Sequence, residues 1–260
     1  MSKVFQGVAK SDPRAIVDEN KAIKLWAHEC MRVFHDRLIS DEDRTLFQEL
    51  LHEKTKSIFK KELDSMVEVK PLLFGSFTPM VYPDDDTSKK PYSDLYCELT
   101  DRDLVKKNCE SALDDFNMMN RSKAMNLVLF TDAIEHILKI HRVITTQYGN
   151  ALLVGVGGSG RKSLTELATF IASYDIVNLE MVKGYGIKEW REDMVNRLFY
   201  MCGVENNPDV FLFSDTQIIN ETFLEDINNI LSSGTVPNLF AKEDIPALID
   251  AVRKDAVKAV

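Results

Sequence analysis

The chain has 260 residues, of which 45% are hydrophobic, so it can bury a core in one large domain or two smaller ones. Its formal net charge of −9 argues against a general nucleic-acid binder, because affinity for phosphate backbones depends on clustered Lys and Arg. No apolar run reaches the roughly 20 residues that a membrane span requires, and the first residues lack the apolar core of a signal peptide, so neither nucleic acid nor membrane is expected as a partner.

Cysteine and histidine spacing indicates no metal site. Cys30, Cys97, Cys109 and Cys202 form no C-x-x-C pair, and they are expected to be reduced thiols. The five histidines lack zinc-site spacing and are expected on helix faces.

The first part of the chain, residues 1–70, reads as a helical hairpin. Apolar residues recur at helical spacing over 14–38, and Ser40 is expected to cap a second helix over 41–66. Within the hairpin, no group of residues has the spacing of a catalytic site. It begins abruptly, as expected of a piece of a longer chain.

Residues 71–99 contain prolines and a run of Asp, and we expect an irregular linker. Thr100 and Asp103 are candidates for capping a helix that ends near 117. A further helix is expected over 122–147, where a Gly-Asn pair follows it.

Strands and helices alternate from residue 151 onward. Continuous apolar strands that alternate with helices predict a parallel sheet covered on both faces, which is an α/β fold. The expected strands are 151–154, 176–180 and 209–215, and the expected helices end near 173, span 187–202 and end at Gly234.

A glycine-rich loop, GVGGSGRKS, follows the first of these strands and opens a helix. Glycine lets backbone N–H groups turn inward around a phosphate, and the helix directs its positive end at the anion. A tight turn without a ligand is the alternative, but four glycines in six residues exceed what a turn needs. The candidate phosphate-binding residues are Gly155, Val156, Gly157, Gly158, Ser159, Gly160, Arg161, Lys162 and Ser163.

The loop departs from the pattern G-x-x-x-x-G-K-[ST]. Arg161 stands where the lysine is expected, and Lys162, which has no hydroxyl for Mg²⁺, stands where Ser or Thr is expected. Ser163 supplies a hydroxyl one residue late. We therefore expect phosphate binding through the backbone and two positive charges, without efficient hydrolysis.

The run VFLFSD ends in Asp215, about 55 residues after the loop. A buried strand that ends in a carboxylate is what a P-loop site needs for holding Mg²⁺ through water and polarising the attacking water. Asp215 is thus the candidate catalytic residue and, with Ser163, the candidate metal residue.

Several stretches resemble the dynein heavy chains of the axonemal branch. LVLFTDAIEHILKIHRVITTQYGNALLVGVGGSGRKSLTELATFIA and VFLFSDTQIINETFLEDINNILSSGTVPNLF are similar to the fourth AAA+ module of that family. LWAHECMRVFHDRL and LLFGSF are similar to the small lid of the third module. The resemblance implies a helical lid over 1–70, a linker over 71–99 and a P-loop NTPase (AAA+) large subdomain over 100–260.

The family implies a ring of six AAA+ modules in one polypeptide, an ATP-driven, minus-end-directed microtubule motor of cilia and flagella. Neighbouring modules, microtubules and dynein intermediate and light chains are then the partners, ATP or ADP with Mg²⁺ the cofactors, and the cytoplasm, cytoskeleton and axoneme the location. Arg161 falls at the family's Walker A lysine.

The Walker B strand of the family is matched in one of two ways. Aligned on TQI, Ser214 replaces the magnesium-side Asp and Asp215 is the catalytic carboxylate, which is the preferred alignment. Aligned on the strand end, Asp215 is the magnesium-side Asp and Thr216 replaces the Glu. Either way one carboxylate is missing. The leading hypothesis is a regulatory nucleotide site, the alternative is a nucleotide-free structural ring segment, and an independent P-loop enzyme is disfavoured by the long helical preface.

Overall fold

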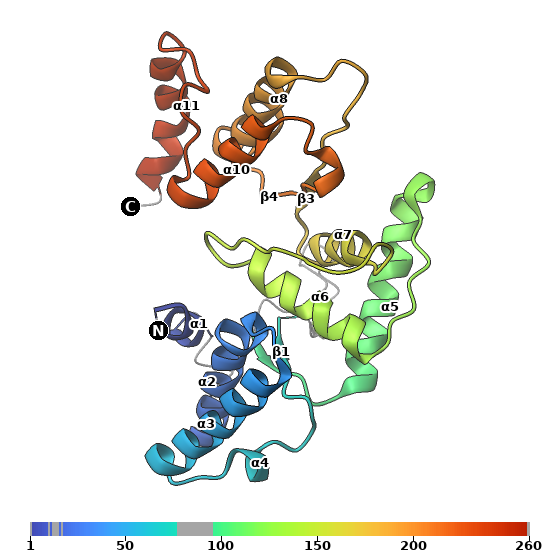
Figure 1. The fold of residues 1–260 in the computed structure, drawn as a ribbon, viewed down its shortest axis with the longest axis vertical. Helices are drawn as coiled ribbons and strands as arrows, with labels where there is room; N and C mark the ends of the chain where they lie inside the picture. The colour runs from blue at the N-terminus through green and yellow to red at the C-terminus, as the bar shows by residue number, and fades with distance from the viewer. Residues whose placement is uncertain (1, 10, 12–15, 17, 77–95, 259–260) are drawn as a thin grey trace, which may run out of the picture. The chain divides into compact units, whose positions relative to one another are not determined.

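A computed structural model describes residues 2–9, 11, 16, 18–76 and 96–258. The chain divides into two compact units (Figure 1). Unit 1 comprises Met1–Arg142 with Gly158–Leu167, and unit 2 comprises Val143–Gly157 with Ala168–Val260. Within the described ranges, no helix is long and apolar enough to cross a membrane.

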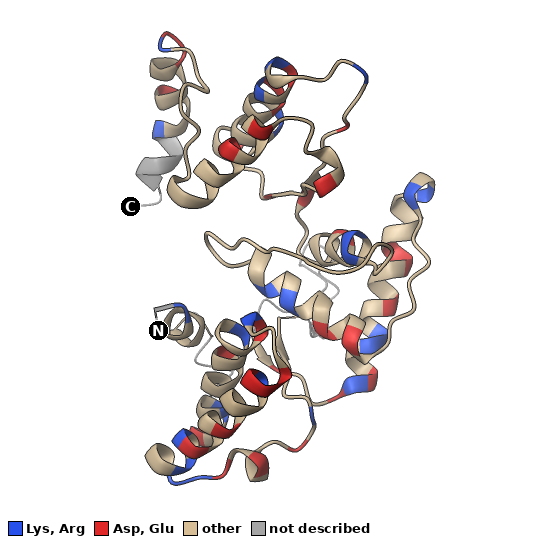
Figure 2. Ribbon diagram, in the orientation of Figure 1, with Lys and Arg blue, Asp and Glu red and all other residues tan. Residues whose placement is uncertain are grey.

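Unit 1 begins with four helices around a shared apolar core. They are α1 (Ser2–Ala9), α2 (Glu19–Val33), α3 (Asp41–Phe59) and the short α4 (Leu63–Met66), with a 3₁₀ turn, η2 (His35–Arg37), between α2 and α3. The core is formed by buried side chains of all four helices: Val4, Ala27, Cys30, Leu51 and Leu63. Lys, Arg, Asp and Glu are interspersed along α2 and α3 (Figure 2), and Lys24 and Glu29 of α2 are buried.

The capping residues set the bounds of α2 and α3. The Asp18 side chain accepts a hydrogen bond from the Lys21 amide at 2.8 Å, so α2 begins at Glu19 rather than near residue 14, and the prediction for that end was wrong. Ser40 caps α3 as predicted, because its hydroxyl accepts from the Asp43 amide at 3.1 Å.

A short antiparallel ribbon lies within the region predicted to be irregular. β1 (Phe74–Gly75) pairs with β2 (Cys97–Glu98), and residues 77–95 lie outside the described ranges. Phe74 and Tyr96 are each 5% exposed and pack with Leu25 of α2. The ends of the predicted linker are thus part of the core of unit 1, because their aromatic side chains have apolar surface to bury.

Two longer helices follow, α5 (Arg102–Met119) and α6 (Thr131–Ile144). The cap of α5 is Asp101, which accepts from the Leu104 amide at 2.9 Å, and neither Thr100 nor Asp103 takes that position.

The helix predicted over 122–147 is shorter at both ends. The Asn117 side chain donates to the Met125 carbonyl at 2.9 Å and accepts from the Met125 amide at 2.7 Å, and these bonds hold this segment outside the helix. A 3₁₀ turn, η3 (Arg121–Lys123), lies just before Met125, and α6 begins only at Thr131.

Unit 2 contains two parallel strands, β3 (Asp175–Val177) and β4 (Asp209–Phe211), and the predicted parallel pairing of these segments is confirmed. The helices of this part are the end of α7 (Arg161–Ile171), α8 (Ile187–Asp193), the π-helical turn η4 (Met194–Phe199), α9 (Tyr200–Gly203), α10 (Glu221–Ser233) and α11 (Ile245–Lys258), with a 3₁₀ turn, η5 (Asp215–Gln217), after β4.

The first predicted strand, 151–154, is not a strand in the structure. Leu152 and Val154 are 89% and 84% exposed, although their apolar character predicted burial. An apolar run becomes a buried strand only where a sheet pairs with it and helices cover it, and the sheet of β3 and β4 does not include these residues.

α8 and α10 lie side by side in unit 2 and contribute to its core together with Val177 of β3, and Phe211 of β4 packs against this core (Figure 1). The rings of Trp190 and Phe223 stack with centroids 4.3 Å apart, and neither is exposed. The indole N–H of Trp190 donates to Asp226 at 3.0 Å. Gly234 ends α10 with φ +72°, as predicted for a residue after a helix.

Candidate functional site

Two of the four glycines of the glycine-rich loop have a left-handed backbone conformation. Gly158 has φ +79° and Gly160 has φ +76°, a region that L side chains rarely adopt. No heavy atom lies within 4 Å of a Cβ built on Gly157 or Gly158, so the space around these two glycines is open. The glycines at 158 and 160 are therefore needed for backbone conformation and not for close packing.

Helix α7 begins at Arg161, directly after the loop. The Leu164 amide donates to the Gly160 carbonyl at 2.8 Å, which closes the first turn. The N–H groups that precede this bond have no carbonyl within the helix, so this end carries partial positive charge and favours an anion. Of the predicted strand, loop and helix, the loop and the helix are present and the strand is not.

The first turn of α7 carries Arg161 and Lys162, which depart from the usual pattern, and Ser163 after them. Lys162 is exposed and lies 4.0 Å from Glu166, one helical turn later. Arg161 and Ser163 are both half-buried. This turn places two cationic side chains and a hydroxyl at the positive end of one helix.

Asp215 opens the turn η5 after β4. It is exposed, and its Oδ1 accepts a hydrogen bond from the Thr216 amide at 3.0 Å. Asp215 belongs to unit 2, whereas Arg161, Lys162 and Ser163 belong to unit 1. The structure therefore gives the local surroundings of Ser163 and of Asp215 separately. That the two residues act together on Mg²⁺ stays a prediction.

Gln217, which the sequence did not single out, is the best-connected side chain near Asp215. It is 8% exposed and bonds to Ser214, Asn178 and Leu179. A Gln just after an apolar strand was the available signal, but spacing alone could not show that its amide reaches a loop almost 40 residues earlier.

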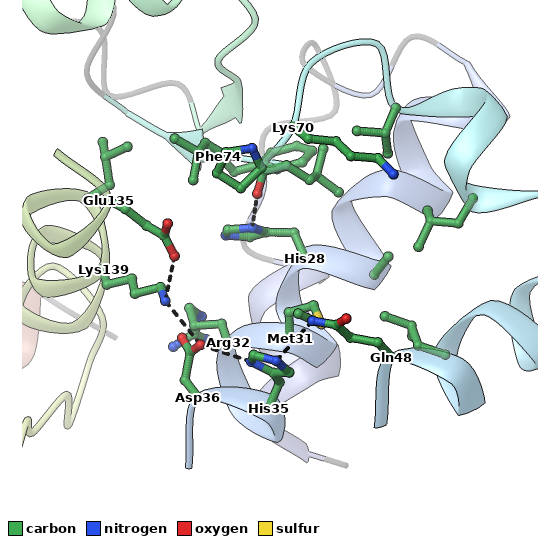
Figure 3. A pocket seen from close by; sticks show the side chains of 18 of the residues that line it. His28, Met31, Arg32, His35, Asp36, Gln48, Lys70, Phe74, Glu135 and Lys139 are labelled. Atoms are coloured by element: carbon green, nitrogen blue, oxygen red, sulfur yellow. Dashed lines mark hydrogen bonds and ion pairs between the residues drawn. The ribbon is translucent and has the colours of Figure 1, made fainter. Parts of the chain in front are cut away.

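A cavity of about 540 Å³ lies within unit 1, and it was not predicted (Figure 3). The Lys139 ammonium group bonds to Glu135 at 2.8 Å and to Asp36 at 3.1 Å across its wall. One ammonium group faces two carboxylates here, so both acidic side chains on this wall are already paired with Lys139.

His28 lies on another wall of this cavity and is held neutral. Desolvation by the surrounding groups lowers the pKa of His28 to about 4. The Leu72 carbonyl, 3.3 Å from Nδ1, can only accept, so Nδ1 carries the proton and Nε2 accepts from the Tyr96 hydroxyl at 3.0 Å. Among the described residues, no group of three His, Cys, Asp or Glu side chains is arranged to hold a metal ion.

Comparison with known proteins identifies the region that carries the loop. The family described as "P-loop containing dynein motor region D4" matches residues 125–259, and the family described as "AAA+ lid domain" matches residues 1–69. The chain is 42% identical over 253 residues to dynein axonemal heavy chain 1 of Mus musculus, and this alignment covers 97% of the chain.

The chain belongs to the axonemal dynein heavy chains. It is also 42% identical to dynein axonemal heavy chain 6 of Homo sapiens over 98% of its length. It is 38% identical to the Dynein-1-beta heavy chain of the flagellar inner arm I1 complex of Chlamydomonas reinhardtii over its whole length. The chain spans about 6% of the length of these dyneins. The predicted AAA+ α/β fold with a preceding lid is confirmed, and the glycine loop and Asp215 both fall in the D4 region.

Proposed function

We propose that this chain is the part of an axonemal dynein heavy chain that carries a degenerate nucleotide site, which binds ATP or ADP and hydrolyses ATP slowly or not at all. The observation that carries the proposal is the loop itself. Its left-handed glycines, Gly158 and Gly160, lead directly into the positive end of α7. Nucleotide binding in general accords with a P-loop AAA+ domain.

Weak hydrolysis follows from the side chains around this loop. Lys162 stands where the family pattern places a hydroxyl for Mg²⁺, and Arg161 cannot act as the compact point charge of a lysine. In the preferred alignment, Ser214 replaces one of two carboxylates and Asp215 is the catalytic one. Both changes remove groups that handle metal and water, while the glycine loop, whose backbone amides would hold the phosphates, is kept.

The proposal extends to the whole heavy chain of which this chain is a part. We propose that the heavy chain is an ATP-driven, minus-end-directed microtubule motor of the cytoskeleton in the axoneme of cilia or flagella. Its partners would be the neighbouring AAA+ modules, the microtubule, and intermediate and light chains. Mg²⁺ would be held through water with the help of Ser163 and Asp215.

The test combines calorimetry of ATP and ADP binding with an assay of phosphate release. The wild-type chain should bind nucleotide with negligible turnover. Lys162→Ala should weaken binding about tenfold or more, because a charge-assisted hydrogen bond contributes about 1.5–3 kcal/mol. Lys188→Ala is the control, because Lys188 is also an exposed lysine that faces a glutamate one helical turn later, Glu192 at 3.8 Å, and its removal should change nothing.

The structural alternative is a ring segment with an empty site. It predicts no nucleotide-dependent rise in melting temperature, whereas bound ligand stabilises the folded state in proportion to RT ln(1 + [L]/Kd). Brisk Mg²⁺-dependent hydrolysis that Arg161→Ala abolishes would contradict both alternatives.

A further inference from the structure

The cavity within unit 1 has a largely apolar interior. Side chains of α2 and of α6 face each other across it, and the residues that line it lie between Ala27 and Arg142, outside the glycine loop (Figure 3). Its volume of about 540 Å³ is in the range of pockets that hold a small organic molecule. The apolar lining includes Met31, Leu51, Leu63, Val67, Phe74 and Leu138. A ligand of this cavity therefore needs an apolar body.

Three rings form one part of the cavity wall. The centroid of the His28 ring lies 5.1 Å from that of Phe74, and the centroids of Phe74 and Tyr96 are 5.9 Å apart. The two ring nitrogens of His28 are already bonded, to the Leu72 carbonyl and to the Tyr96 hydroxyl. These rings favour a flat aromatic ligand, because aromatic pairs gain more than the burial of their area.

The carboxylates that line the cavity already have cationic partners. Asp36 and Glu135 each pair with Lys139, and their side chains are 26% and 28% exposed, so water also solvates them. The Asp64 carboxylate pairs with Lys70. A cationic ligand would compete with these lysines and with water.

The Arg32 guanidinium differs from these groups, because it is more buried and its charge is only partly balanced. Its Nε and one Nη both donate to Oε2 of Glu29, at 3.0 and 2.7 Å. Glu29 also accepts from Arg142, so one buried carboxylate is shared by two guanidinium groups. Among the described residues, no acceptor bonds to the other Nη of Arg32, whose side chain is 16% exposed. Arg32 therefore keeps a charged donor for a further acceptor.

We propose that this cavity binds a small organic carboxylate with an aromatic or apolar body. The carboxylate of the ligand accepts a charge-assisted hydrogen bond from Arg32, and its body lies against the rings and the apolar side chains. A neutral molecule with the same body lacks this bond. The cavity is a different site from the glycine loop, so the inference does not depend on the proposed nucleotide site.

The test is calorimetry of the full chain with phenylbutyrate and with phenylbutanol, its neutral counterpart. Arg32→Gln removes the charged donor and leaves the apolar lining intact. Met31→Trp leaves every charge in place and fills part of the cavity with a larger side chain. Arg44→Gln is the control for the first variant, because Arg44 also pairs with an acid three residues earlier, Asp41 at 3.1 Å. Met118→Trp, at a methionine of α5 that is 71% exposed, is the control for the second.

The wild-type chain should bind phenylbutyrate about tenfold more tightly than phenylbutanol. Arg32→Gln should lose this preference and still bind phenylbutanol, Met31→Trp should bind neither ligand measurably, and both controls should behave as wild type. Circular dichroism checks that the variants fold, and the preference of the wild-type chain decides if one does not.

Equal affinity of the wild-type chain for the acid and the alcohol would overturn the inference. So would unchanged phenylbutyrate binding by Met31→Trp, or no saturable binding of phenylbutyrate by the wild-type chain at millimolar concentration. Nucleotide binding at the glycine loop is measured separately, and none of these outcomes alters it.

Discussion

The guanidinium group of Arg142, on α6, donates to the carboxylate of Glu29, on α2, at 3.3 Å. The Glu29 side chain is not exposed, and Arg32 donates to its Oε2 from Nε at 3.0 Å and from an Nη at 2.7 Å. Arg142 also donates to the Gly7 carbonyl of α1 at 3.1 Å and lies 3.8 Å above the Tyr96 ring. One buried carboxylate thus connects the N-terminal helices of unit 1 with α6.

Removing this carboxylate charge should be costly. Glu29→Gln would leave two arginines facing a neutral group inside unit 1, and breaking a buried pair in this way destabilises a protein by about 3–5 kcal/mol. Urea unfolding followed by circular dichroism measures the change. Glu192→Gln, in an exposed pair with Lys188, is the control and should cost less than about 0.5 kcal/mol. Equal effects in the two variants would contradict the role given to Glu29.

Gly7 should not tolerate a side chain. A Cβ at this position would lie 2.1 Å from Glu29 Oε2, and the arginines that hold this carboxylate prevent it from moving away. Gly7→Ala should therefore lower the free energy of unfolding by about 1–3 kcal/mol. Gly203→Ala, where a Cβ meets nothing within 4 Å, should be neutral or slightly stabilising. Thermal unfolding of the two variants distinguishes a steric effect from a general loss of glycine.

His28 should make the stability of the chain depend on pH. Its pKa in the folded state, about 4, is below the usual 6.5, so between these values the unfolded chain binds more protons than the folded chain. The free energy of unfolding should rise with pH through this window, by up to about 1.4 kcal/mol per pH unit, and the contribution is lost as pH falls from 6.5 to 4. Urea titrations at several pH values should show a smaller slope for His28→Gln. An unchanged slope would mean that other groups dominate.

Two substitutions in the loop should strengthen the binding of Mg²⁺ together with a nucleotide. Arg161→Lys combined with Lys162→Thr recreates the G-K-T end of the usual pattern and supplies the hydroxyl that Lys162 lacks. The double variant should gain Mg²⁺-dependent nucleotide affinity relative to wild type and still turn over slowly, because a carboxylate at position 214 is missing. Single-turnover phosphate release measures both properties. Rapid hydrolysis by this variant would place the defect in the loop alone.

Local signals in the sequence predicted much of the fold. Ser40 and Gly234 were identified as caps because their chemistry acts on the adjacent backbone. The parallel pairing of the segments at β3 and β4 followed from the alternation of strands and helices. The start of α6 was missed, because the bonds from Asn117 to Met125 compete with the helix and no periodicity reveals them.

The sequence indicated that the glycine loop needs conformational freedom, while the part that its residues play in binding stays a prediction. Glycine content indicated the left-handed turns at Gly158 and Gly160. The hydrogen bonds of the Gln217 side chain were missed, because its partners Asn178 and Leu179 come from a loop that is distant in sequence. Leu152 was predicted to be buried and is exposed, because an apolar pattern reports what a sheet would bury and not whether the sheet is there.

We propose that backbone amides at the head of α7 hold the phosphates of a nucleotide. Amide chemical shifts of the full 260-residue chain, recorded by TROSY NMR during an ADP titration, test it most directly. The Gly158, Gly160 and Arg161 amides should show saturable shifts with the same midpoint as calorimetry, while the Gly203 amide stays unchanged. Amides of the loop that do not shift at millimolar ADP, with or without Mg²⁺, would contradict it.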